Sequence, residues 1–431
     1  DARYGSSEFA TAACRVASAA GVRVLALPQA NPTPLTSFSM LHFDADAGVM
    51  VTASHNPAPD NGYKVYLGGT VAQGDGRGVQ IVPPFDAEIA AAIEAAPPAD
   101  EVPMNDDLIE AVDPREEYVA CASALASGEA SAREDLRIVL TAMHGVGAAI
   151  TSRVLAEAGF SNVSLVAAQA QPDPDFPTVP FPNPEEAGAL DMAIEQAREQ
   201  GADLIIAVDP DADRCALAVP DPASETGWSP LSGDQIGSLL GEFLASRGMK
   251  GSLANSIVSS RLLSRIARAH GLEHHTTLTG FKWIARAPGL GFGYEEAIGF
   301  CPDPAHVRDK DGIATSVVAA SLVAALKAQG RSVWDELERL ARLHGLHVSS
   351  PLTFRVEEIE QIASGMARLR AQPPSVLAGS PVVEVSDLSQ GYRGLPPTDG
   401  VLVLTEAGDR VIARPSGTEP KLKCYLEVIL P

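Results

Sequence analysis

The sequence predicts an α/β protein made of three successive, related α/β units followed by a smaller C-terminal α+β unit. Up to about residue 349, short apolar runs of strand length alternate with helical segments, an order that indicates mixed or parallel sheets covered by helices. From about residue 350, several short strand-like runs surround a single predicted helix. The 431 residues leave room for three or four domains of ordinary size.

The first unit is expected at 1–131, and a Ser/Gly/Ala-rich link at 127–131 marks its end. Its alternation of strands and helices begins midway, as if a leading strand were missing. The residues Asp60-Asn61-Gly62 form a hairpin signal before a strand. The predicted helices are 9–20, 35–42, 85–96 and 114–126, and the predicted strands are 22–27, 47–51 and 63–66.

The second and third units are expected at 132–231 and 232–349, and the fourth at 350–431. A proline-rich stretch, 171–184, must be an ordered loop or crossover. Segment 311–329 is apolar enough to be buried and is expected to be the last helix of the third unit. The other predicted helices are 148–158, 189–200, 235–246, 261–270 and 357–370, and the strands are 136–141, 204–208, 252–258, 352–356, 382–385, 401–404, 410–414 and 423–429.

Composition and charge limit the classes of partner. The net charge of −23 disfavours nucleic acid and anionic membranes, because no basic field offsets it. No apolar run reaches the roughly 18–20 residues of a membrane span, and no secretory signal is visible. The five cysteines are scattered, which argues for a reducing cytoplasm and against a disulfide framework or zinc site. We expect a cytoplasmic protein that is a monomer or a weak homodimer.

A serine follows the strand 47–51 directly, in the stretch Thr52-Ala53-Ser54-His55-Asn56-Pro57. Pro57 disfavours the helical conformation of the residue before it, so Ser54 is expected in a turn at the end of the strand. A hydroxyl that is exposed and rigidly placed can carry a covalent group. An idle serine in an ordinary turn is the alternative. Lys64 comes near Ser54 if the following hairpin folds back.

Three carboxylates stand at alternate positions after the strand 204–208, in Asp209-Pro210-Asp211-Ala212-Asp213-Arg214. In a loop stiffened by proline they can converge on one hard cation, and a few carboxylates plus a phosphate oxygen suit Mg²⁺ better than Ca²⁺. A solvated acidic turn is one alternative. A phosphatase with Asp209 as nucleophile is another, but it leaves Ser54 unexplained.

Two further stretches offer groups for a sugar. Glu295 and Glu296 are adjacent acids among glycines and aromatics, suited to bind two vicinal hydroxyls, although an exposed acidic turn would look the same. In Thr279-Gly280-Phe281-Lys282-Trp283, Lys282 could bind a phosphate or ring oxygen, or merely flank a buried Trp283.

The stretch 414–423 combines backbone amides around Gly417, the hydroxyls of Ser416 and Thr418, and the charges of Arg414 and Lys423. Together these groups form an anion cradle, in preference to a chance basic turn in so acidic a protein. With the serine and the aspartates, the cradle suggests a substrate that carries a phosphate at one end and an acceptor hydroxyl at the other.

The four motifs, in this order and spacing, resemble the α-D-phosphohexomutase superfamily, specifically its phosphoglucomutase/phosphomannomutase branch. The resemblance covers essentially the whole chain and implies four domains around a central cleft. It implies a mutase that interconverts hexose 1-phosphate and hexose 6-phosphate (glucose, mannose or both) through a phosphoserine and a sugar bisphosphate. Mg²⁺ and a sugar bisphosphate primer are the implied cofactors, and a phosphosugar is the implied substrate.

The resemblance also implies roles for single residues. Ser54 is the phosphoserine, and its phosphate binds Mg²⁺ together with Asp209, Asp211 and Asp213. Arg214 supports that phosphate, while Lys64 and His55 assist proton transfer. The residues implied in substrate binding are Glu295 and Glu296 for sugar hydroxyls, Thr279, Gly280 and Lys282 for sugar choice, and Arg414, Ser416, Gly417 and Thr418 for the substrate's own phosphate.

Two departures from the family pattern matter. Family members begin with a further strand and a glycine- and arginine-rich segment ahead of Asp1, and we expect that this sequence lacks that segment. The pattern Glu295-Glu296-Ala297-Ile298-Gly299-Phe300 differs from the Glu-Ser-Gly-His form of many phosphomannomutases. It is closer to the subgroup that includes phosphopentomutases and glucose-1,6-bisphosphate synthases. Those activities, or a non-catalytic sugar-phosphate binding protein, are the alternatives.

Overall fold

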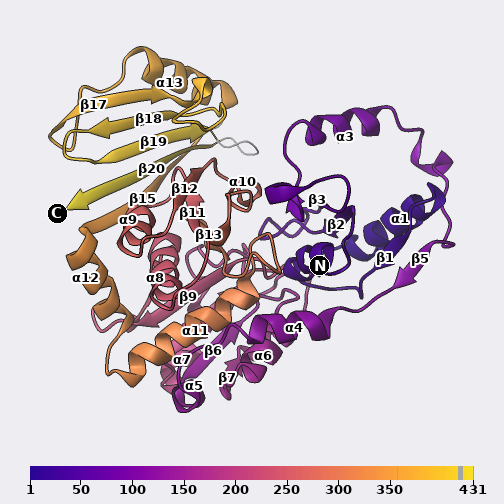
Figure 1. Ribbon diagram of the computed structural model, residues 1–431, viewed down its shortest axis with the longest axis horizontal. Coiled ribbons are helices and arrows are strands. Elements are labelled where there is room, and N and C mark those ends of the chain that lie inside the picture. Colours follow the sequence, from indigo (N-terminus) through magenta and orange to yellow (C-terminus); the bar gives the residue numbers. More distant parts are fainter. Residues whose placement is uncertain (357, 416–420, 431) are drawn as a thin grey trace.

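The computed structural model describes residues 1–356, 358–415 and 421–430. Figure 1 shows the chain running from an N-terminal unit, through two central units of sheet and helix, to a C-terminal antiparallel sheet with one helix against it. The predicted fold class, three α/β units and a smaller α+β unit, is confirmed.

The first unit has its strands in two small sheets. β1 pairs with β5 in parallel, and β2, β3 and β4 form an antiparallel sheet. Met50 pairs with Lys64 across the predicted hairpin, which is confirmed. The elements are α1 (Ser6–Ala19), β1 (Val24–Ala26), α2 (Thr33–His42), β2 (Ala47–Val51), β3 (Tyr63–Leu67), β4 (Val79–Gln80), α3 (Phe85–Glu94), β5 (Ile109–Ala111) and α4 (Arg115–Ser123).

The second unit is a five-stranded sheet in the order β10-β9-β8-β6-β7. β7, β6 and β8 are parallel, and β9 and β10 complete the sheet in antiparallel fashion. All five residues of β8 are buried, as expected for an apolar strand inside a covered sheet. The elements are α5 (Ala130–Asp135), β6 (Arg137–Thr141), α6 (Ala148–Glu157), β7 (Asn162–Leu165), α7 (Asp191–Gln200), β8 (Leu204–Val208), β9 (Cys215–Pro220) and β10 (Trp228–Pro230).

The third unit has the sheet order β12-β11-β13-β14. The prediction that 311–329 is its last helix is wrong, because α12 follows after a short turn. Ser332 and Asp335 form a capping box at the start of α12, and Val333 and Leu340 are buried. The elements are α8 (Gly233–Ser246), β11 (Ser252–Ser256), α9 (Leu262–Ala269), β12 (His274–Thr277), α10 (Phe281–Ile284), β13 (Leu290–Glu295), β14 (Gly299–Cys301), α11 (Gly312–Ala328) and α12 (Val333–His344).

The fourth unit is a six-stranded sheet in the order β15-β20-β19-β18-β17-β16, with α13 packed on one face. β15 pairs with β20 along its whole length, so the predicted start of this unit at 350 lies inside a strand that begins at Leu346. The elements are β15 (Leu346–Arg355), α13 (Ile359–Ala371), β16 (Val376–Leu377), β17 (Ser380–Asp387), β18 (Val401–Thr405), β19 (Arg410–Pro415) and β20 (Lys421–Leu430).

One continuous apolar core joins the first three units. It reaches from Leu35 and Phe38 of α2, through β6 and β8, to Phe292 of β13. α11 lies inside it, as predicted, and contacts α4, α5 and α6 as well as β8 and β14. Across the described residues, no single helix has both the length and the apolar character to cross a membrane. α11 and α12 reach that threshold only as a pair, with a bend of 92° between them.

Candidate active site

Ser54 lies in the turn after β2, as predicted. Its backbone φ is +51°, a left-handed conformation that is uncommon for a residue with a side chain. The Ser54 amide donates to the Thr52 hydroxyl at 2.9 Å and so fixes the turn locally. The Ser54 hydroxyl lies 2.9 Å from Asp209 Oδ2 and 3.3 Å from His55 Nδ1. The serine and the aspartate loop, 155 residues apart, therefore meet directly.

A buried arginine near the start of the chain holds this turn. Arg3 Nη2 donates to the carbonyls of Ser54 and Asn56 at 2.6 and 2.7 Å. Arg3 Nη1 donates to the carbonyls of Pro57 and Asp60 at 2.7 and 3.1 Å. The sequence reasoning missed Arg3, because its partners lie more than 50 residues away and no local pattern announces them. Four carbonyls on one planar fork fix the path of the Ser54 loop.

The three aspartates converge as predicted. Asp209, Asp211 and Asp213 are fully buried, and one oxygen from each lies within 4.8 Å of the others. The loop is pinned to the turn after β6, since the Val146 amide donates to the Pro210 carbonyl at 2.9 Å. Gly145 permits that approach, because a Cβ there would lie only 2.3 Å from the Pro210 backbone.

This aspartate cluster fits a hard divalent cation. Within the described residues, Asp211 Oδ1 and Asp213 Oδ1 are buried without a hydrogen-bond partner. Buried carboxylate oxygens normally have donors, so these two acceptors are free to serve as ligands of a cation. Burial, and then the charges of Asp211 and Asp213, raise the pKa of Asp209 well above its usual value. A bound cation would relieve that repulsion.

Two lysine side chains bring positive charge to the three aspartates. Lys64 Nζ lies 2.7 Å from Asp211 Oδ2 and 2.5 Å from Asp213 Oδ2. Lys310, which the sequence reasoning missed, places its Nζ 3.1 Å from Asp213 Oδ2. Although burial acts to lower it, the two aspartates raise the pKa of Lys64, so its ammonium group stays protonated. Lys64 is therefore a charged hydrogen-bond donor to these aspartates.

His55 stands beside the serine as a neutral ring. Burial, and after it the charge of Arg214, lower the pKa of His55 to about 2. Its Nδ1 faces the Ser54 hydroxyl at 3.3 Å. A neutral imidazole can accept or donate a hydrogen bond there.

Arg214 connects the aspartate loop to the acidic turn. Its amide donates to Asp209 Oδ1 at 2.9 Å, and Nη1 donates to the Ala297 carbonyl at 2.8 Å. Nη2 lies 3.9 Å from Glu295 Oε1. The predicted metal loop and the predicted sugar-binding acids are thus neighbours, joined by one guanidinium.

Glu296 is held by serines. Its Oε2 accepts hydrogen bonds from the hydroxyls of Ser256 and Ser259, both at 2.9 Å. Burial, and then the neighbouring Glu295, raise the pKa of Glu296 to about 7. Near pH 7 the carboxyl group is therefore partly protonated, and it can accept a hydrogen bond when ionised or donate one when protonated.

The remaining predicted residues lie on the third and fourth units, and a hydrogen bond joins the two units. Gly280, with φ +102°, precedes α10 and Lys282. Arg414 at the end of β19 donates to the hydroxyl of Thr279. Ser416, Gly417 and Thr418 lie outside the described residues. Burial raises the pKa of Tyr425 in β20 most, and the charge of Glu296 raises it further while that of Arg414 lowers it.

The chain matches four family models in succession. Their descriptions are Phosphoglucomutase/phosphomannomutase alpha/beta/alpha domain I (residues 1–99), domain II (116–223), domain III (232–343) and C-terminal domain (354–428). The chain belongs to the phosphoglucomutase/phosphomannomutase family of the α-D-phosphohexomutase superfamily.

Individual proteins show the same relationship. The chain is 45% identical to a Haemophilus influenzae protein named "Probable phosphomannomutase", over 99% of this chain and 86% of the relative. It is 34% identical to a Staphylococcus haemolyticus phosphoglucomutase, over 99% and 81%. The crystal structure of a Thermus thermophilus protein provisionally assigned as a phosphomannomutase matches with a TM-score of 0.75 and 26% identity, over 99% of this chain and 84% of that one.

Proposed function

We propose that the protein is a phosphosugar mutase that interconverts hexose 1-phosphate and hexose 6-phosphate, with glucose, mannose or both as the sugar. The observation that carries this proposal is the 2.9 Å contact between the Ser54 hydroxyl and Asp209, inside a buried group of three aspartates. A hydroxyl meant to carry a phosphoryl group needs such a neighbourhood, because the transferred group brings negative charge that a cation must offset. Membership of the family, and the names of the relatives, agree with it.

Ser54 is proposed as the residue that carries the phosphoryl group. In the first half-reaction the bond between phosphorus and Ser54 Oγ breaks, and a new bond forms to the free hydroxyl of the sugar phosphate. The proton of that hydroxyl is released, and Ser54 Oγ takes up a proton. The sugar bisphosphate then turns end for end and returns its other phosphoryl group to Ser54. A sugar bisphosphate primer can load Ser54 by the reverse of the first step.

Asp209, Asp211 and Asp213 would hold Mg²⁺ together with the phosphate on Ser54. When bound, Mg²⁺ supplies positive charge to the phosphoryl oxygens during transfer. We assign Lys64 to assist proton transfer at the serine oxygen, because it lies on the strand that pairs with β2, the strand that ends just before Ser54. His55 orients the hydroxyl through its ring nitrogen. Arg214 would support the phosphate, because it already bridges the aspartates and Glu295.

The other end of the substrate is assigned to the third and fourth units. Glu295 and Glu296 would bind sugar hydroxyls, and the two serines on Glu296 fix its orientation. Thr279, Gly280 and Lys282 would influence the choice of sugar. Arg414, with Ser416, Gly417 and Thr418, would bind the phosphate that does not react. The contact between Arg414 and Thr279 supports a site shared between these two units.

The domain boundary at 231/232, and a monomer or weak homodimer as the assembly, remain our predictions for this enzyme. The predicted boundaries at 131/132 and 349/350 fall inside α5 and β15, so we propose them at the starts of these two elements instead.

A coupled assay on the full chain tests the activity. Glucose 1-phosphate, mannose 1-phosphate and ribose 1-phosphate are offered separately with Mg²⁺ and the matching bisphosphate primer. We expect turnover of a hexose phosphate. Preferred turnover of ribose 1-phosphate would move the assignment to a pentose phosphate mutase, and the absence of turnover with all three would refute the mutase.

Ser54→Ala tests the carrier. We expect it to abolish transfer while leaving the circular dichroism spectrum unchanged, because the side chain is small and sits in a loop. Intact-mass spectrometry after incubation with the primer should add one phosphate to the wild type and none to the variant. Ser7→Ala, an exposed serine on α1, is the matched control. Substantial turnover by Ser54→Ala would exclude Ser54 as the carrier.

A further inference from the structure

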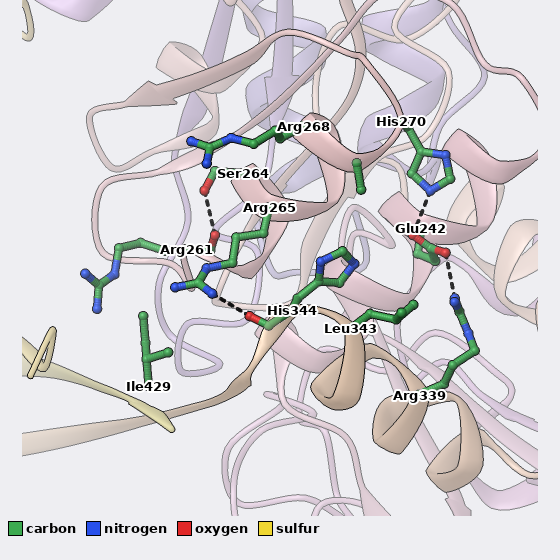
Figure 2. A pocket seen from close by; sticks show the side chains of 11 residues that line it. Glu242, Arg261, Ser264, Arg265, Arg268, His270, Arg339, Leu343, His344 and Ile429 are labelled. Carbon is green, nitrogen blue, oxygen red and sulfur yellow. Dashed lines mark hydrogen bonds and ion pairs between the residues drawn. The ribbon is translucent and has the colours of Figure 1, made fainter. Parts of the chain in front are cut away.

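A cavity lies apart from the proposed mutase site, where the third unit meets the fourth. Figure 2 shows it between α9, α12 and the end of β20, and its volume is about 890 Å³. That volume lies within the range of small-molecule sites. The lining residues that carry its charge or mark its position between the two units are Arg261, Arg265, Arg268, Arg339, His344 and Ile429. None of them belongs to the proposed mutase site.

The charge of this cavity is opposite to that of the protein. The chain has a net charge of −23, yet four arginines line the cavity against one carboxylate, Glu242. Arg261, Arg265 and Arg268 follow one another at helical spacing, so they share one face of α9, while Leu262, Leu263 and Ile266 are buried on the other. The helix therefore presents a basic face to the cavity.

Two of these arginines have no anionic partner among the described residues. Glu242 is paired with His270 and Arg339, at 2.9 and 2.6 Å, and Arg261 is paired with Glu427 at 2.6 Å. Arg265, by contrast, donates only to the carbonyl of His344. In the parts of the chain that the structure describes, no carboxylate lies within ion-pair distance of Arg265 or Arg268. Unpaired guanidinium groups beside a cavity favour an anion with several oxygens, such as a phosphate.

The cavity also spans a joint in the chain. His344, whose carbonyl accepts from Arg265 at 2.6 Å, is the last residue of α12. Gly345 follows with φ +85°, and β15 begins at the next residue. Ile429, on the strand paired with β15, lines the same cavity. A ligand here would touch both units at their connection.

We propose that this cavity binds a phosphorylated small molecule, with its anionic groups on Arg265 and Arg268. The ligand braces α9 against the joint between α12 and β15. An acidic peptide is the other source of negative charge. It fits less well, because the arginines of the neighbouring hollow, Arg331, Arg339 and Arg342, are already paired with Glu336, Glu242 and Glu338, so they offer no unpaired charge to an acidic chain that continued along α12.

The test uses inorganic pyrophosphate as the probe and the full chain as the receptor. His270 and His344 both line the cavity, so their imidazole NMR signals, assigned with His270→Gln and His344→Gln, report on this place and not on the mutase site. We expect saturable shifts of both signals in the wild type. The double variant Arg265→Gln/Arg268→Gln should bind at least tenfold more weakly, because it loses both unpaired charges.

The matched control is Arg198→Gln/Lys250→Gln, which also removes two exposed positive charges but lies on α7 and after α8. It should bind as the wild type does. Circular dichroism of both double variants checks that they fold, and their mutase activity without probe should be unchanged. Equal affinity in the Arg265/Arg268 variant, equal loss in the control, or shifts confined to His55 would each refute the proposal. Shifts caused by hexaglutamate but not by pyrophosphate would instead establish an acidic protein segment as the partner.

Discussion

At the scale of single residues, the Ser54 turn is held from two directions. Its own Thr52 hydroxyl and the distant Arg3 together fix a left-handed serine that would be strained in a free loop. Strain of this kind persists only where the surroundings over-determine it, and such places often carry function. Arg3 is therefore a positioning residue for the proposed carrier, because its hydrogen bonds go to the backbone of the Ser54 loop and not to the Ser54 hydroxyl.

Arg3→Lys tests this role. The substitution keeps the charge but loses the planar fork that binds four carbonyls, so the loop should shift. A displacement of about 1 Å at a reacting group can lower the rate by about 100-fold. We expect a fall in kcat of that order with a much smaller change in KM, measured in the coupled assay. Arg23→Lys, in an exposed ion pair with Glu110, is the control. A wild-type kcat in Arg3→Lys would contradict the assigned role.

Glu296 gives a prediction about pH and stability. Its pKa of about 7 in the folded protein lies above the usual value of about 4.3 for an unfolded glutamate. Between these two values the folded state binds the proton that the unfolded state has lost, so rising pH favours unfolding over this window. Above pH 7 the penalty is complete, and it amounts to up to about 4 kcal/mol.

Glu296→Gln removes this titration and keeps the shape of the side chain. We expect the difference in unfolding free energy between pH 5 and pH 8, measured with urea, to be smaller in the variant than in the wild type. Glu273→Gln, an exposed glutamate before β12, is the control because it should leave that difference unchanged. An identical pH dependence in wild type and Glu296→Gln would show that the carboxyl titrates normally.

At the scale of elements, the sequence predicts those parts whose cause is local. The strand before Asp209 is an apolar run of five buried residues, and alternate aspartates after it face one place. The hairpin signal at 60–62 correctly sets Lys64 against Met50 and so near the serine. Long-range partners are different: nothing near Arg3 or Lys310 in the sequence indicates which carbonyls or carboxylates they meet.

Two features of the fold were not predicted from the sequence, α12 and the two separate sheets of the first unit, and each omission has a physical explanation. The capping box Ser332–Asp335 and the apolar spacing of Val333 and Leu340 were available as signals for α12. The long apolar run of α11 made that helix look like the end of its unit, although a second helix was needed to cover α8 and α9. In the first unit, the separation of β1 and β5 from β2, β3 and β4 depends on pairing across the chain, which alternation alone does not specify.

Gly145 joins two elements by close approach, and its substitution tests how the aspartate loop is positioned. In Gly145→Ala the new Cβ would meet the Pro210 backbone at 2.3 Å, so the loop between β8 and β9 must move. Overpacking of this kind costs about 1–3 kcal/mol. We expect that loss in urea unfolding, together with weaker Mg²⁺ binding by calorimetry. Gly365→Ala on α13 has open space around it and should be neutral or slightly stabilising. An unchanged Mg²⁺ affinity in Gly145→Ala would show that the position of the aspartate loop does not determine cation binding.

At the scale of the whole molecule, the site depends on contacts between units that are far apart in the chain. Asp309 Oδ2 accepts from the Tyr66 hydroxyl at 2.6 Å and from Gln80 Nε2 at 2.7 Å. Arg286 adds a bond of 2.8 Å to the Gln80 carbonyl. The bonds to Asp309 fasten β3 and β4 of the first unit to the segment before α11, and the Arg286 bond fastens β4 to the residues after α10. The segment before α11 also carries Lys310, whose ammonium group faces Asp213. These contacts between units, which we call the seam, therefore also position a positive charge inside the site.

Tyr66→Phe tests whether this seam supports the site. The substitution removes one buried hydroxyl and leaves Asp309 with fewer donors, a change that costs about 1–3 kcal/mol. Tyr63→Phe lies on the same strand but is 54% exposed, so it should cost little. We expect Tyr66→Phe to lower the unfolding free energy and to speed hydrogen exchange at β3 and β4 more than in the sheet of the second unit. If exchange rose equally in both sheets, the Tyr66 hydroxyl would stabilise the molecule as a whole, because the shared core couples the units. If Tyr66→Phe matched Tyr63→Phe, the seam would rest on Gln80 and Arg286 instead.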